Sequence, residues 1–251
     1  MAICIDIREE AGVRTLHFGS EWIQGAMRIA RPWHLELEYT RDMMASLLFR
    51  DDARFPRNVL LIGLGAASLT KFLYRNFPLA RLTVVEIEPA VVAAARQFFK
   101  LPEDPQRLNL VVGDGAEFVI SGDKQYDLIL VDGFDAQARS GPLNTLPFYQ
   151  NCRARLSPNG IVAINLLGRS RDYKGNLERI QSAFDDRALP IPPCESGNVI
   201  VLAAAGEPIC VGLDDLREQA AALKEKTGLN LLPVVSRLER TPGITAGLIN
   251  L

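Results

Sequence analysis

Two aspartates three residues apart follow a strongly apolar stretch in the middle of the chain. Asp132 comes directly after the run 126–131, and Asp135 follows in Gly133-Phe-Asp135. One carboxylate of such a pair can take a proton from an amine while the other holds positive charge, which suits general-base chemistry on a cationic amine. The alternative is a solvated loop in which both aspartates only stabilise turns. The following stretch to residue 145 is long for a connection, which favours a functional loop.

A glycine-containing segment, Gly63-Leu-Gly65-Ala-Ala67, separates an apolar stretch from a helical pattern. Glycines at such a place let the backbone turn sharply and let a ligand approach closely. Glu86 ends the next apolar stretch about 20 residues later, where an acid can accept hydrogen bonds from ribose hydroxyls. The segment lacks the third glycine of the full dinucleotide motif. It therefore predicts a nucleoside site or, alternatively, a tight strand–helix connection that binds nothing.

A further acid, Asp114, lies in Gly113-Asp-Gly115 after another apolar stretch. In open α/β sheets, ligands bind outside the carboxyl ends of the strands, so Asp114 is placed to accept from an adenine amino group. It is equally suited to cap the following helix. The two roles are compatible, and both stay open.

The elements that must position these residues alternate between strand and helix patterns. Strands are expected at 58–63, 81–86, 108–112, 125–131 and 161–166, helices at 66–76, 89–99, 146–156 and 174–184, and a closing strand pair at 188–193 and 198–204. Such alternation predicts βαβ units and an α/β fold with a mostly parallel sheet covered on both faces.

The two ends of the chain follow other patterns. Residues 2–31 alternate weakly, which predicts short antiparallel strands, and a helix is expected at 36–49. We therefore expect a small N-terminal β-region with a connecting helix at 1–50 and an α/β domain at 51–251. The tail is expected to contain a helix at 214–226, whose stripe of Leu216, Ala220 and Leu223 packs on the sheet, and then an irregular end.

Composition and charge exclude several classes of protein. Lys and Arg total 28 and Asp and Glu total 30, so the net charge of −2 argues against a nucleic-acid binder. No apolar run approaches the roughly 20 residues that span a bilayer, and acids within the first ten residues argue against a signal peptide. The 4 cysteines form no C-x-x-C pair, which argues against a zinc site. We expect reduced thiols, a cytoplasmic protein, no metal, and no nucleic-acid or membrane partner.

Taken together, these residues resemble the spermidine synthase family of polyamine aminopropyltransferases from about Gly19 to Leu166. The matching segments are Gly19-Ser-Glu-Trp-Ile-Gln24, Val59-Leu-Leu-Ile-Gly-Leu-Gly-Ala-Ala67, Val85-Glu-Ile-Glu88, Gly113-Asp-Gly115, Tyr126-Asp-Leu-Ile-Leu-Val-Asp-Gly-Phe-Asp135, and Phe148-Tyr149 through Gly160. The resemblance implies a small N-terminal β-domain followed by a Rossmann-like domain of the S-adenosylmethionine-dependent methyltransferase type. It also implies a homodimer.

The resemblance further implies a reaction and a role for each matching residue. An aminopropyl group would pass from decarboxylated S-adenosylmethionine to a polyamine acceptor, and methylthioadenosine would leave. Asp132 would be the general base; Asp135, Tyr39 and Glu36 would bind the acceptor; and Gln24, Gly63, Gly65, Glu86, Asp114 and Gly115 would bind the donor.

One departure from the family pattern keeps other functions open. Ala66 stands where the family turn has an Asp that holds the ammonium group of the donor, so a charge-assisted contact is lost. A methyltransferase that uses intact S-adenosylmethionine is therefore an alternative. A non-catalytic nucleoside-binding or assembly protein is a further one.

Overall fold

A computed structural model describes residues 3–52, 54–135, 137, 139–241 and 247–251. The chain begins with a three-stranded antiparallel sheet of β1 (Asp6–Glu10), β2 (Val13–His17) and β3 (Ile23–Arg28). Ala11 and Gly12 both have positive φ, which suits the two-residue turn of a tight hairpin between β1 and β2. The expectation of short antiparallel strands at this end is confirmed.

The connecting helix is shorter and less regular than predicted. It begins two residues late, as α1 (Glu38–Met43), and continues as a 3₁₀ segment, η1 (Met44–Phe49), whose six residues are all buried. The Ser46 hydroxyl donates to Met43 O at 2.8 Å, a local bond that competes with the regular helical pattern.

The central sheet has seven strands with helices between them. In chain order the elements are β4 (Asn58–Ile62), α2 (Ser68–Asn76), β5 (Arg81–Glu86), α3 (Pro89–Phe98), β6 (Leu108–Val112), α4 (Gly115–Ser121), β7 (Tyr126–Val131), η2 (Gly141–Asn144), α5 (Leu146–Ala154), β8 (Leu156–Leu167), α6 (Tyr173–Ala183), β9 (Ala188–Pro190) and β10 (Asn198–Ala204). The strand order is β6-β5-β4-β7-β8-β10-β9. The five strands from β6 to β8 are parallel, while β10 and β9 are antiparallel to their neighbours.

The direction of chain progression reverses between β4 and β7. From β4 the chain moves outward through β5 and β6, and then returns to the other side of β4 as β7 and β8. The crevice at such a switch point is where α/β folds bind ligands. The glycine-rich turn follows β4 and Asp132 follows β7, so both lie at this crevice.

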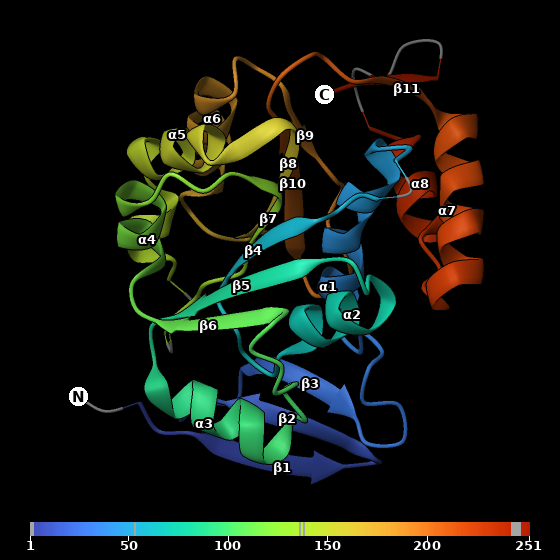
Figure 1. Cartoon of the computed structure of the whole chain (residues 1–251). Helices are drawn as coiled ribbons and strands as arrows, with labels where there is room; N and C mark the ends of the chain where they lie inside the picture. The colour runs from blue at the N-terminus through green and yellow to red at the C-terminus, as the bar shows by residue number, and fades with distance from the viewer. Residues whose placement is uncertain (1–2, 53, 136, 138, 242–246) are drawn as a thin grey trace.

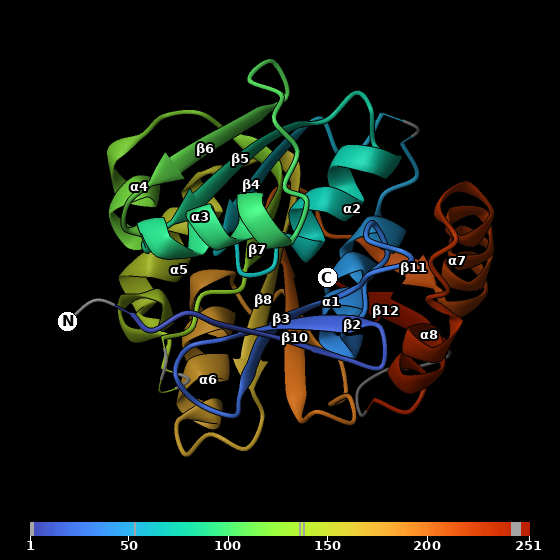
Figure 2. The ribbon, with the colours of Figure 1, turned by 90° about the horizontal axis from the view of Figure 1, so that it is seen from below.

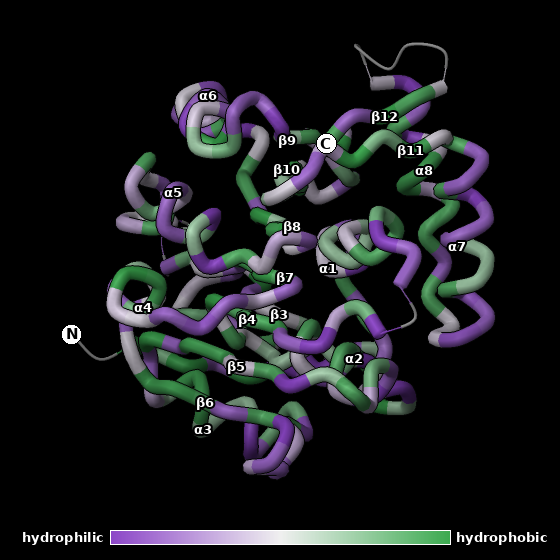
Figure 3. Tube along the Cα trace, turned by 45° about the horizontal axis from the view of Figure 1, so that its top comes forward, coloured by the Kyte–Doolittle hydropathy of each residue, from purple (hydrophilic) through white to green (hydrophobic). Residues whose placement is uncertain are grey.

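Both faces of the sheet are buried, which explains the nearly continuous apolar runs. Val59 and Leu61 of β4 belong to the core on one face, and Leu60 and Ile62 belong to the core on the other. Helices α4, α5 and α6 supply the second core, whereas α1, η1, α2 and α3 supply the first (Figure 1). In Figure 3 the trace is hydrophobic along most of β4 and β5, while hydrophobic and hydrophilic residues alternate along α7. The predicted α/β class is confirmed.

The N-terminal sheet lies against one side of this domain. It is below the central sheet in Figure 1 and crosses in front of it in Figure 2. Its strand β3 contacts α2, the helix that follows the glycine-rich turn. Through this contact the first strands reach the crevice.

The C-terminal tail is more regular than predicted. After β11 (Cys210–Gly212) and α7 (Leu213–Thr227) come a second helix, α8 (Leu232–Leu238), and a strand, β12 (Leu248–Asn250), that pairs with β11. The prediction of an irregular end was wrong. The apolar stripe of α7 also has other partners than expected, because α7 packs mainly on η1, β11 and α8. In the parts of the chain that the structure describes, no helix is long and apolar enough to cross a membrane.

Candidate active site

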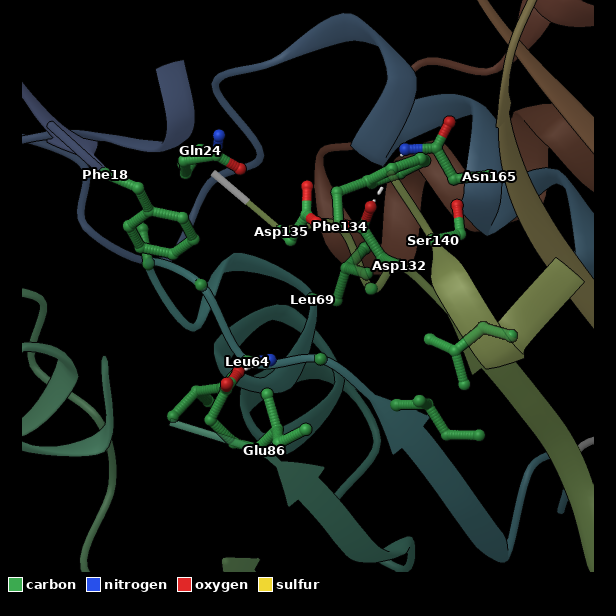
Figure 4. A pocket seen from close by; sticks show the side chains of 18 of the residues that line it. Phe18, Gln24, Leu64, Leu69, Glu86, Asp132, Phe134, Asp135, Ser140 and Asn165 are labelled. Carbon is green, nitrogen blue, oxygen red and sulfur yellow. Dashed lines mark hydrogen bonds between the residues drawn. The ribbon is translucent and has the colours of Figure 1, made fainter. Parts of the chain in front are cut away.

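A cavity of about 700 Å³ opens at the carboxyl ends of β4, β5 and β7. Its walls come from the N-terminal sheet, the glycine-rich turn, the loop after β7 and the turn before β10. Figure 4 shows Glu86 and Leu64 in the lower part of the view, Asp132 and Asn165 on the other side, Asp135 close to Asp132, and Gln24 at the upper left. Most residues predicted to do chemistry therefore share one space.

Close backbone contacts explain the glycines at this crevice. Gly63 has φ +96°, and a Cβ atom there would lie 2.2 Å from Asp132 O. The Asp132 N–H donates to Ile62 O at 2.9 Å, so the end of β4 is tied to the end of β7. A Cβ on Gly65, which has φ +50°, would lie 3.1 Å from Gln24 O. Larger residues would push apart the segments that form the site.

Glu86 is a buried acid whose orientation is fixed by the backbone. Its Oε2 accepts from the Leu64 N–H at 2.9 Å, and its Oε1 accepts from the Glu88 N–H at 3.0 Å. Burial raises the pKa of this carboxyl, and the two backbone donors partly oppose the rise. A carboxylate has about four lone-pair positions, so Glu86 can still accept from hydroxyl groups of a ligand.

Asp114 caps a helix and also lines the cavity. Its Oδ1 accepts from the Ala116 N–H at 2.7 Å, which caps α4. The same residue lines the cavity, as does Gly115. A Cβ on Gly115 would lie 2.4 Å from Ile62 Cγ2, so only glycine fits the beginning of this helix as it is packed.

Asp132 lies at the centre of a hydrogen-bonded group. Tyr39 Oη donates to Asp132 Oδ2 at 3.2 Å, and Asn165 Nδ2 donates to Asp132 Oδ1 at 2.8 Å. Burial raises the pKa of Asp132, while the bonds from Asn165 and Tyr39 partly lower it. Burial and the nearby Asp132 raise the pKa of Tyr39 well above its usual value, so Tyr39 remains a neutral donor.

The orientation of Asn165 is set by a chain of hydrogen bonds outside the predicted site. Asn198 Nδ2 donates to Asn165 Oδ1 at 2.9 Å, and Ser196 Oγ donates to Asn198 Oδ1 at 2.6 Å. Because the Asn165 oxygen accepts from Asn198, its amide nitrogen is the atom that faces Asp132. Sequence reasoning missed Asn165. The available signal was a lone polar residue within the apolar strand 161–166.

Asp135 is bound by its own loop. Its Oδ1 accepts from the backbone N–H groups of Gln137 and Arg139, and its Oδ2 accepts from the Arg139 guanidinium at 2.9 Å. Burial acts to raise the pKa of Asp135, but the bonds from Arg139 and Gln137 outweigh it and lower the pKa. Asp135 lines the cavity as an ionised acid whose charge is already paired with Arg139.

Glu36 lies apart from the other predicted residues. It pairs with Arg28 and borders a smaller hollow, not the cavity that holds Asp132. Glu38, two residues later on α1, lines the main cavity together with Tyr39. The family resemblance alone assigns Glu36 to the acceptor; in the structure Glu36 precedes α1, whereas Glu38 and Tyr39 lie on it.

Acids outnumber bases in the cavity lining although the chain is almost neutral, and three of the acids, Glu21, Glu38 and Asp135, are paired with arginines. Seven carboxylates line it, namely Glu21, Glu38, Glu86, Glu88, Asp114, Asp132 and Asp135. Among the described lining residues, Arg139 is the one basic side chain. Such a lining favours ligands with several positive charges.

This arrangement of strands and helices is that of a known class of α/β folds. Human methyltransferase-like protein 13, solved in complex with SAH, superposes with a TM-score of 0.68 at 23% identity and covers 84% of this chain and 96% of its own. A probable spermidine synthase from Corynebacterium glutamicum gives 0.69 at 19% identity, with 90% and 91% covered. These similarities show the methyltransferase-type fold.

The sequence, unlike the fold, also identifies the family. Residues 36–168 match the model of the spermine/spermidine synthase domain. A polyamine aminopropyltransferase from Chromobacterium violaceum is 38% identical over 243 residues, which is 97% of this chain and 92% of that protein. The chain therefore belongs to the spermine/spermidine synthase family, as the sequence motifs predicted.

Proposed function

We propose that the chain transfers an aminopropyl group from decarboxylated S-adenosylmethionine to a polyamine acceptor and releases methylthioadenosine. The observation that carries this proposal is the juxtaposition of Asp132 with an acid-lined cavity. Both substrates are cations, and the cavity offers seven carboxylates against one guanidinium among its described lining residues. The family relatives described above carry the name of this activity.

The donor nucleoside is assigned to the crevice between the glycine-rich turn and β5. Glu86 would accept from the ribose hydroxyls, and Asp114 would accept from the adenine amino group. The Gly63, Gly65 and Gly115 positions let the backbone stay close to the ligand, and Gln24 would contact it from β3. The lining of the cavity and the orientation of Glu86 support these assignments.

The acceptor amine is assigned to the region of Asp132, Tyr39 and Asp135. Its ammonium group would pair with Asp135 in competition with Arg139. Glu36 is not assigned to this region, because it does not line the cavity, and Glu38 takes its place.

Asp132 would act as the general base. An alkylammonium has a pKa of about 10 and cannot attack until it is deprotonated. One proton moves from the ammonium to the Asp132 carboxylate, and the freed nitrogen lone pair forms a bond to the carbon next to the sulfonium. The carbon–sulfur bond breaks, its electrons stay on sulfur, and neutral methylthioadenosine leaves. Holding both reactants in one cavity supplies much of the acceleration.

The replacement of the family Asp by Ala66 specifically favours a second candidate, a methyltransferase that uses intact S-adenosylmethionine. Ala66 is buried, and its Cβ would lie 2.6 Å from a Cβ placed on Gly25. Because alanine has no carboxylate, the turn itself offers no negative charge to a donor ammonium. In our proposal the other cavity acids supply that charge.

Product identification by mass spectrometry separates the two candidates. The protein is incubated with putrescine or a longer polyamine and with each donor separately. We expect methylthioadenosine and an aminopropylated amine with the decarboxylated donor alone. Formation of S-adenosylhomocysteine from the intact donor would instead indicate a methyltransferase. Tight nucleoside binding without either product would indicate a non-catalytic protein.

The homodimer stays a prediction. Ile23 and Ile29 of the N-terminal region are 50% and 36% exposed, and burial of these side chains would favour association through that sheet. Light scattering at several protein concentrations measures the oligomeric state directly, and a monomer at all concentrations would contradict the prediction.

A further inference from the structure

One arginine joins the C-terminal helix α8 to α1, the helix that carries Tyr39. Arg237, on α8, donates from Nη1 to Glu38 Oε1 at 2.8 Å, and its Nη2 bonds to Asp42. Both acids lie on α1, four residues apart, so one guanidinium holds one face of this helix. Figures 1 and 2 both show α7 and α8 on the side of the molecule where α1 lies.

This contact is more enclosed than the other ion pairs of the tail. The side chain of Asp42 is 3% exposed and that of Arg237 is 21% exposed. Arg217, on α7, also bonds to two acids, but its partners Asp214 and Glu239 are 94% and 51% exposed. Pairs in water contribute little to structure, whereas loss of one partner of a buried pair leaves an uncompensated charge.

Helix α1 depends on such external contacts. It has six residues and no side-chain hydrogen bond at its N-terminus. Isolated helices of this length are not stable in water, so packing must fix its position. Tyr39 lies on α1 between the two partners of Arg237, and its hydroxyl is one of the two donors to Asp132.

Asn165, the second donor to Asp132, is connected to the same arginine through Glu38. While Glu38 Oε1 binds Arg237, Glu38 Oε2 accepts from the Glu195 N–H at 3.0 Å. Glu195 precedes Ser196 and Asn198, which set the orientation of the Asn165 amide. Arg237 is therefore connected, through Glu38 and α1, to both side chains that donate to the Asp132 carboxylate, Tyr39 and Asn165.

We propose that Arg237 is a positioning residue for the transfer reaction: through Glu38 and Asp42 it holds Tyr39 and the 194–198 turn so that both donors of Asp132 keep their orientation. The proposal rests on the proposed function. It assigns a role to the tail, in which sequence motifs indicated none.

The test compares Arg237→Gln with Arg217→Gln in the full-length protein. We expect Arg237→Gln to lower kcat by about 10-fold to 100-fold with little change in KM, because small misplacements of reacting groups cost this much. Arg217→Gln removes a double ion pair from the same tail without touching α1, and should leave kcat unchanged. Arg237→Lys should recover part of the lost rate.

Two readouts distinguish positioning from a general loss of structure. In a Tyr39→Phe background, Arg237→Gln should cost less than in the wild type, because the part of its effect that acts through the Tyr39 hydrogen bond is already lost. Hydrogen exchange should rise in residues 38–43 and stay unchanged in β4. Full additivity of the two substitutions, or an unchanged kcat with folded Arg237→Gln protein, would overturn the proposal.

If Arg237→Gln does not fold, Asp42→Asn replaces it, since the shape of the side chain is kept and the ion pair is removed. Faster exchange in residues 38–43 of this variant supports the proposal, and unchanged exchange overturns it. The exchange readout does not need turnover. If the wild-type protein transfers no aminopropyl group, the proposed function fails, whereas the exchange data still decide whether Arg237 holds α1.

Discussion

At the scale of single residues, Asp132 has to be ionised to act as a base although it is largely enclosed. Burial raises its pKa, and the bonds from Asn165 and Tyr39 favour the ionised form. If Asp132 is the base, as we propose, the two donors extend activity toward lower pH. They also leave the carboxylate with lone pairs that can receive a proton.

Replacement of Tyr39 by Phe should move the acidic limb of the pH profile. Loss of the hydroxyl donor destabilises the carboxylate, so the pKa of Asp132 rises further. Asp132 of the variant is therefore protonated at a higher pH than in the wild type, and the acidic limb of the kcat/KM profile shifts to higher pH. Tyr74→Phe is the matched control, because Tyr74 Oη also donates to a carboxylate, Asp104 Oδ2, but Tyr74 does not line the cavity. An unshifted limb in Tyr39→Phe would show that this bond does not tune the base.

Replacement of Asn198 by Asp should turn the Asn165 amide around. The new carboxylate can only accept, so the Asn165 amide nitrogen would turn toward it and the amide oxygen would face Asp132. Two acceptors then meet, and we expect a fall in kcat of about 10-fold or more from the lost charge-assisted bond. Steady-state kinetics measures the effect. Asn198→Ser, which can still donate, should lose less, and equal losses in both variants would contradict this role of Asn198.

At the scale of elements, the site is formed by two strand ends that approach closely. Gly63 at the end of β4 lies against the backbone of Asp132 at the end of β7. The proposed base and the turn proposed to receive the donor are therefore parts of one junction. A change in the turn should displace the base as well as the nucleoside.

Gly63→Ala should destabilise this junction. A Cβ would lie 2.2 Å from Asp132 O, and the positive φ disfavours any L side chain. We expect a loss of roughly 2 kcal/mol or more in the free energy of unfolding. Urea denaturation measures it. Gly113→Ala is the control, because Gly113 has no positive φ and a Cβ added there would meet no atom within 4 Å. Equal stability of the two variants would show that the contact is not essential.

Some elements could be predicted from the sequence and others could not. Strands β5 and β10 were predicted at their observed bounds, because strong apolar patterns and flanking turns define them. Helix α8 was missed because its seven residues carry too short a pattern to stand out from the tail. The role of Glu36 was carried over from the family motif, and the structure places its side chain beside Arg28 and outside the cavity.

At the scale of the whole molecule, the charge is distributed very unevenly. The chain has a net charge of −2, yet seven carboxylates and one guanidinium are found among the described residues that line the cavity. The linear sequence did not reveal this, because the acids come from segments far apart in the chain. The nucleoside motifs, in contrast, were visible because each is contiguous. Asn165 and Arg237 were not, since their roles depend on partners brought together by the fold.

The acidic cavity predicts a strong effect of salt on the acceptor. Raising the ionic strength from about 0.05 to 0.5 M shortens the Debye length to a few ångströms and screens attraction at the entrance. We expect kcat/KM for the polyamine to fall, and to fall more steeply for an amine of higher charge. Steady-state kinetics at constant pH measures both. No dependence on salt would indicate that the acids do not face the acceptor.

The most direct test of Asp132 as the base is the effect of Asp132→Asn on methylthioadenosine release from decarboxylated S-adenosylmethionine and a polyamine. The variant keeps the size of the side chain but cannot take the proton of the ammonium. We expect kcat to fall by about 100-fold or more, while methylthioadenosine binding, measured by calorimetry, stays at the wild-type level. Turnover at the wild-type rate would contradict the assignment of Asp132 as the base.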